Sequence, residues 1–132
     1  MQRKLSILNI ILLWGLAATQ SCDPDSGERY YVQNGTEATI IVSYTIAHDT
    51  VRIQALAGTT ELIYEYYDTG ATTDLGDDFL HRFDSLWIEY NGNPIKKQWT
   101  LRENWSFEIT DDKGLSNAGI GNYTFTIISN DL

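Results

Sequence analysis

Short segments in which apolar and polar side chains alternate recur along most of the chain and constrain its fold more than any other feature. In the segment 38–47, Ile40, Val42 and Tyr44 share one face, whereas polar side chains occupy most of the other face. Successive side chains of a strand point to opposite faces, so a period of two predicts half-buried β-strands. The pattern predicts strands over residues 30–33, 38–47, 50–56, 60–67, 84–90, 95–101, 104–109 and 123–129.

The spacing of these segments predicts the fold class. Short strands joined mostly by tight turns, without an amphipathic helical period, predict an all-β domain. We expect a single antiparallel β-sandwich of about eight strands, with a small β-barrel as the alternative. The segment 29–132 holds roughly 100 residues, enough for one hydrophobic core and too few for two. Because the chain lacks the Cys-Trp-Cys pattern of true immunoglobulin domains, the sandwich is expected to be only loosely immunoglobulin-like.

Side-chain parity and turn residues give more detailed expectations. In the fourth predicted strand, Leu62 is expected to face the core and Ile63 to face outward. A four-residue loop at 91–94 is expected to pair Tyr90 with Ile95. The pair Asn34-Gly35 tolerates positive φ and predicts another turn, which explains these residues better than the glycosylation sequon that they form with Thr36.

The N-terminal segment has the pattern of a secretory signal peptide. Arg3 and Lys4 form a short positive region, and residues 5–18 form an almost unbroken apolar run. A membrane-spanning helix needs about 20 apolar residues, so this run is short for a span. We therefore predict that residues 1–21 are a signal peptide that is removed.

Cys22 follows this segment directly and is the only cysteine, so the chain can form no internal disulfide. The segment 16–22, with the small residue Ser21 before the cysteine, resembles the lipobox of bacterial lipoproteins. The resemblance implies a diacylglyceryl thioether on Cys22 and an amide-linked acyl chain. Each buried methylene contributes about 0.8 kcal/mol, so two or three acyl chains anchor a protein durably in a membrane.

The residues after the cysteine predict a short polar tether over 22–28, followed by the folded domain over 29–132. The acidic residues Asp23, Asp25 and Glu28 resemble the export tags of some lipoproteins of Bacteroidetes. This resemblance implies a lipid-anchored protein of the outer membrane, on its periplasmic or its cell-surface side.

The domain itself resembles small β-rich lipoproteins of Bacteroidetes. The resemblance depends on the sequence Phe-Asp-Ser-Leu-Trp-Ile at 83–88 and on the closing Tyr-x-Phe-x-Ile at 123–127. It implies a fold and a location but no activity.

The charge of the chain disfavours nucleic acid as a partner. Without Arg3 and Lys4 the mature chain has seven Lys and Arg against eighteen Asp and Glu, a formal charge of −11. Such a surface repels phosphate backbones and anionic lipid headgroups. The acidity is typical of a soluble exported surface.

The search for catalytic or metal-binding motifs predicts no enzyme and no cofactor. His48 and His81 lie far apart in the sequence without metal-ligand spacing, so both are expected in loops or at the surface. Asp74, Asp77 and Asp78 lie in the long segment 68–78 and are candidate calcium ligands, because flexible oxygen ligands suit that ion. A solvated acidic loop explains the same residues without a metal.

Two aromatic residues depart from the core pattern. Trp87 lies between the inward Leu86 and Ile88 and is predicted to face outward, and Tyr67 is predicted to do the same on its own strand. Exposed Trp and Tyr rings stack on sugars or anchor protein interfaces, so both are candidate ligand or interface residues. Cover by a loop or a neighbouring strand is the alternative.

Three functional hypotheses follow. The first is a non-catalytic binding or interaction module, anchored in the membrane, with another surface protein as its partner. The second is glycan capture at the cell surface, which requires Trp87 and Tyr67 to be exposed and coplanar. The third is a hydrolase, which requires carboxylates such as Glu65 and Glu89 to face one another.

Overall fold

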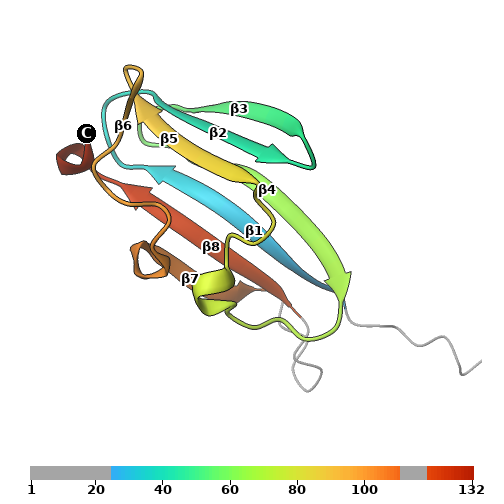
Figure 1. Ribbon diagram of the computed structural model, residues 1–132. Coiled ribbons are helices and arrows are strands. Elements are labelled where there is room, and N and C mark those ends of the chain that lie inside the picture. The colour runs from blue at the N-terminus through green and yellow to red at the C-terminus, as the bar shows by residue number, and fades with distance from the viewer. Residues whose placement is uncertain (1–24, 111–118) are drawn as a thin grey trace, which may run out of the picture.

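A computed structural model describes residues 25–110 and 119–132 as two four-stranded sheets packed face to face (Figure 1). The first sheet has the order β4-β1-β8-β7 and the second the order β3-β2-β5-β6. The predicted all-β sandwich is confirmed, and the two sheets do not close into a barrel. The strands are β1 (Asp25–Asn34), β2 (Ile40–Ile46), β3 (Asp49–Ala55), β4 (Thr60–Thr69), β5 (Ser85–Tyr90), β6 (Asn93–Pro94), β7 (Trp105–Thr110) and β8 (Ile120–Ile127).

The first and last strands pair at the centre of the first sheet. β1 and β8 run parallel, from Gly27 opposite Ile120 to Asn34 opposite Ile127, whereas the other strand pairs are antiparallel. No hairpin loop joins β1 to β8, so no turn geometry fixes their relative direction. This long-range pairing decides which side chains meet on the outer face of the first sheet.

The core lies between the two sheets and is rich in aromatic rings. Tyr30 of β1 stacks on Tyr123 of β8 with ring centroids 5.2 Å apart, and Phe83 packs edge-on against Tyr30 at 5.0 Å. The segment between β4 and β5 contains the 3-10 helix η1 (Gly76–Asp78). The buried Phe79, which follows η1, contacts Tyr123 and Trp105, so this segment closes one end of the sandwich (Figure 1).

A β-bulge on β4 overturns the expected orientation of two side chains. Tyr30 pairs with Tyr64 but Tyr31 pairs with Leu62, so Ile63 is an extra residue on β4. A bulge shifts the alternation by one residue. Ile63 is therefore only 2% exposed and Leu62 is 41% exposed, the reverse of the prediction.

The hairpin after β5 is tighter than predicted, and residues 95–101 do not form a strand. Asn91 and Gly92 both have positive φ, 49° and 78°, as a two-residue type I′ turn requires, so Tyr90 pairs with Asn93 instead of Ile95. The chain then crosses to the first sheet.

The crossing segment protects the edge of β5 with one backbone bond, from the N–H of Ile95 to the Ile88 carbonyl at 3.2 Å, and beyond it with a side chain. The indole Nε1 of Trp99 donates to the carbonyl oxygen of Leu86 at 2.8 Å, and Nε1 of Trp105 donates to the carbonyl oxygen of Trp99 at 2.7 Å. A strand edge with open carbonyls invites pairing with another chain. The Trp99 indole thus supplies a donor to β5 where β6 is too short to do so, and the Trp105 indole holds the backbone of Trp99 in place.

β1 also begins earlier than expected. Residues 25–28, predicted as part of the tether, belong to the strand, and Glu28 forms an ion pair with Arg82 at 2.9 Å. Glu28 is thus a folded, half-buried residue and not part of a free acidic segment. Cys22 and Asp23 lie outside the described residues.

Candidate functional site

The two predicted outward aromatic residues are both exposed, Trp87 at 47% and Tyr67 at 51%. Trp87 lies on β5 and pairs across the strand with Ser43 of β2, on the outer face of the second sheet. Tyr67 lies on β4, on the outer face of the first sheet. The predicted exposure of both residues is confirmed. The two rings do not form the coplanar pair that glycan capture by both residues requires, because the outer faces of two packed sheets point away from each other.

Tyr67 is held in place by a polar cluster on the first sheet. Nη2 of Arg29 donates to the Tyr67 hydroxyl at 2.8 Å, and this hydroxyl donates to Oε2 of Glu65 at 2.9 Å. The hydrogen bond to Tyr67 raises the pKa of Arg29. A Cβ on Gly27 would lie 3.2 Å from Cδ1 of Tyr67, so the missing side chain leaves room for the ring. The exposed ring is therefore fixed before any ligand arrives.

A recess opens beside this cluster on the same face. Its volume is about 300 Å³, and we call it the outer recess. It lies over all four strands and is lined by Arg29, Tyr31, Thr60, Glu108, Thr110, Asn122 and Thr124. Arg29 pairs with Glu65 on one side and with Asn122 on the other, and Asn122 pairs with Glu108. One row of polar side chains thus crosses the whole sheet.

Sequence reasoning missed the outer recess. Alternation alone places Arg29 and Tyr31 on the face opposite the buried Tyr30. It does not show that β8 lies beside β1, and that pairing brings Asn122 and Thr124 to the same place.

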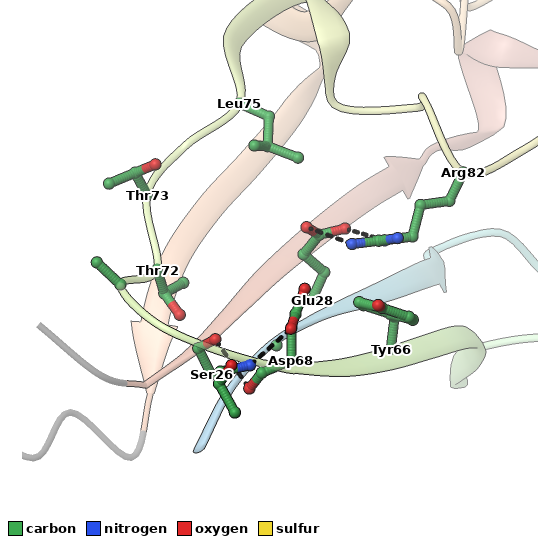
Figure 2. A pocket seen from close by; sticks show the side chains of 11 residues that line it. Ser26, Glu28, Tyr66, Asp68, Thr72, Thr73, Leu75 and Arg82 are labelled. Atoms are coloured by element: carbon green, nitrogen blue, oxygen red, sulfur yellow. Dashed lines mark hydrogen bonds and ion pairs between the residues drawn. The ribbon is translucent and has the colours of Figure 1, made fainter. Parts of the chain in front are cut away.

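A second, smaller cavity of about 120 Å³ lies at the end of the sandwich, between β1, β4 and the segment that follows β4 (Figure 2). Figure 2 shows Glu28 and Arg82 pointing toward one another across it. The Arg82 guanidinium carbon lies 3.4 Å from the centroid of the Tyr66 ring, and the Tyr30 hydroxyl donates to Oε2 of Glu28 at 3.1 Å. The charged groups of Glu28 and Arg82 therefore pair with one another, and these contacts attach the segment after β4 to the first sheet.

The calcium candidates do not gather into a site. Nε of Arg102 donates to Oδ1 of Asp74 at 2.9 Å, and this bond lowers the pKa of Asp74. The Tyr123 hydroxyl also donates to Asp74, at 3.3 Å. Asp77 and Asp78 are exposed in η1. Within 25–110 and 119–132, no three His, Cys, Asp or Glu side chains approach as metal ligands would.

The remaining polar residues also have structural explanations. His48 lies in the β2–β3 turn and His81 is exposed, as predicted. Glu65 and Glu89 lie on different sheets, and each is paired with an arginine, so they do not face one another. Asn34 is fully buried, and it ends a strand instead of forming the predicted positive-φ turn.

Comparisons with protein families, with curated proteins and with solved structures found no match to this chain. The helices in the described part of the chain are all too short to cross a membrane. Function must therefore be argued from the sheet faces, the cavities and the sequence of the N-terminal segment.

Proposed function

We propose that the protein is a non-catalytic binding module, anchored in the outer membrane through acyl chains on Cys22, and that it binds its partner on the outer face of the first sheet. The observation that carries this proposal is the fixed, exposed ring of Tyr67 beside the outer recess. Rigid aromatic residues give large contact areas at little cost in conformational entropy, and they dominate binding energy at interfaces.

The carboxylates support a binding role over hydrolysis. A catalytic carboxylate pair needs two groups on either side of one substrate bond. Glu65, Glu89 and Asp74 instead lie in separate regions, and each forms an ion pair with an arginine.

The proposed anchor sets where the binding face lies. β1 begins three residues after Cys22, and an extended chain spans at most about 3.5 Å per residue. The Asp25 end of the first sheet would therefore stay within about 11 Å of the Cα of the lipidated Cys22. Tyr67, whose strand partner is Gly27, lies at this end, so its partner would be bound close to the membrane surface.

The two exposed aromatic residues allow a matched test. Detergent-solubilised full-length protein is applied to a panel of glycans and surface proteins, beside Tyr67→Ala and Trp87→Ala variants. Loss of capture in Tyr67→Ala alone supports the proposal, whereas loss in Trp87→Ala alone places the binding face on the second sheet. The anchor is tested with Cys22→Ser, which should move the protein out of the membrane fraction, and continued membrane association of a processed Cys22→Ser protein contradicts lipidation.

A further inference from the structure

We infer that the outer recess binds one neutral sugar ring, with a ring hydroxyl between Arg29 and Asn122. The inference rests on the proposed function and names the ligand class of the same face. Three observations support it: two buried polar atoms without a partner among the described residues, the mixed charge around the recess, and an exposed aromatic ring that is hydrogen-bonded to Arg29 of the lining.

The unpaired atoms form a complementary pair. Asn122 is only 6% exposed, and its Nδ2 donates to Thr110 Oγ1 at 2.7 Å and to the Ile120 carbonyl at 3.4 Å. Among the described residues its Oδ1 has no hydrogen-bond partner, and neither does Nε of Arg29, whose nearest carboxylate oxygen, on Glu65, is 3.4 Å away. Buried polar groups are nearly always paired, so these two atoms need an explanation.

A hydroxyl group satisfies both atoms at once. The hydroxyl donates its proton to Oδ1 of Asn122 and accepts the hydrogen of Nε of Arg29. The parallel pairing of β1 and β8 places Arg29 and Asn122 opposite one another on neighbouring strands. Both atoms lie beneath the accessible surface, so the Arg29 side chain must turn slightly to admit the group. Among the described residues, the polar contacts of the Arg29 side chain come from Tyr67 and Glu65 of β4, so this movement breaks no bond to β8.

The rest of the lining selects the ligand class. Glu65 and Glu108 lie at the two ends of the polar row that contains Arg29 and Asn122, so two carboxylates face one guanidinium and the excess negative charge disfavours an anion. The threonine hydroxyls and the carboxylates offer acceptors to further hydroxyl groups of the ligand. A volume of about 300 Å³ is at the lower end for small-molecule sites, which suits a single ring. The exposed ring of Tyr67, whose hydroxyl accepts a hydrogen bond from Arg29 of the lining at 2.8 Å, offers an apolar face to the C–H bonds of the sugar.

The test is saturation-transfer NMR on detergent-solubilised full-length protein with millimolar methyl glycosides of glucose, galactose, mannose and N-acetylglucosamine. Arg29→Lys keeps the charge and removes Nε, and Glu108→Gln removes one acceptor. Each should weaken binding of the preferred glycoside at least about fivefold, the effect of one lost hydrogen bond. Glu89→Gln, which removes a carboxylate from the second sheet, is the matched control and should bind as the unaltered protein does.

The outcomes separate this inference from the proposed function. Thermal melting first shows that each variant is folded. Glycoside binding that is equal in Arg29→Lys, Glu108→Gln and Glu89→Gln places the sugar elsewhere and overturns the inference. If no glycoside binds but Tyr67-dependent capture of a protein persists, the ligand class is wrong and the proposed function stands. If neither sugar nor protein is captured, both are overturned.

Discussion

Replacing Asn34 with alanine should destabilise the protein more than any single surface substitution, because its side chain makes four hydrogen bonds where the chain passes from one sheet to the other. Nδ2 donates to the carbonyl oxygens of Ala38 at 2.7 Å and Ala55 at 2.9 Å. Oδ1 accepts from the backbone N–H of Thr36 at 3.0 Å and from its hydroxyl at 2.8 Å. Asn34 itself is completely buried.

The magnitude follows from the groups that Asn34→Ala leaves unpaired. The Ala38 carbonyl keeps a longer bond from the Thr36 hydroxyl, at 3.3 Å, so the main losses are at the Ala55 carbonyl and the Thr36 N–H. An unsatisfied buried group costs about 1–3 kcal/mol, which gives about 2–6 kcal/mol for the pair. Domains are stable by only about 5–15 kcal/mol, so much of the stability would be lost.

Urea unfolding followed by tryptophan fluorescence measures this change. For a slope of about 1–3 kcal/mol per molar urea, the midpoint should fall by at least about 0.7 M. Asn93→Ala is the control, because exposed Asn93 makes only a local bond to the Asn91 carbonyl at 3.3 Å. A loss of less than about 1 kcal/mol in Asn34→Ala would refute the account of this connection.

Three further predictions concern the closed end and the strand edge. Burial raises the pKa of Tyr123 to about 12, against about 10 in the unfolded chain, so the folded state keeps this proton to a higher pH. The free energy of unfolding should therefore fall by about 2–3 kcal/mol between pH 10 and 12. Unfolding curves measured over this pH range should show a smaller fall in Tyr123→Phe. The pKa of Asp74 is lowered by Arg102, so its stabilising contribution, present above the unfolded value of about 3.9, is lost as the pH falls through the folded pKa; acid titration of Arg102→Gln should lack this component. Trp99→Phe leaves the Leu86 carbonyl without its donor and should cost about 1–3 kcal/mol in urea unfolding, with aggregation detected by light scattering.

Local alternation predicted the strands and the outward aromatic residues because it depends only on neighbours within one strand. It failed at Leu62 and Ile63, because a bulge adds a residue without leaving a signal in the alternation. It also failed for residues 95–101, where apolar residues at alternate positions serve the crossing between sheets. Here Ile95 and Trp99 are buried without a continuous strand ladder.

The two Asn-Gly pairs show where turn chemistry stops being predictive. Asn91-Gly92 adopts positive φ at both residues and closes a hairpin. Asn34-Gly35 does not, because the N–H of Gly35 donates to the Ile127 carbonyl at 2.8 Å and prolongs the pairing with β8. A Cβ on Gly35 would lie 3.0 Å from that oxygen, so glycine is needed here for close approach and not for its φ.

The two exposed aromatic residues differ in what their rings contact. The ring of Trp87 packs edge-on against Trp99, with centroids 5.2 Å apart, and Trp99 protects the edge of β5. Part of the reason for a tryptophan at position 87 is therefore structural. Among the described residues Tyr67 pairs with no other aromatic ring, yet its hydroxyl is fixed by Arg29 and Glu65. An exposed ring that is held rigid without an aromatic partner favours a role in recognition, and for this reason we propose the binding face on the first sheet.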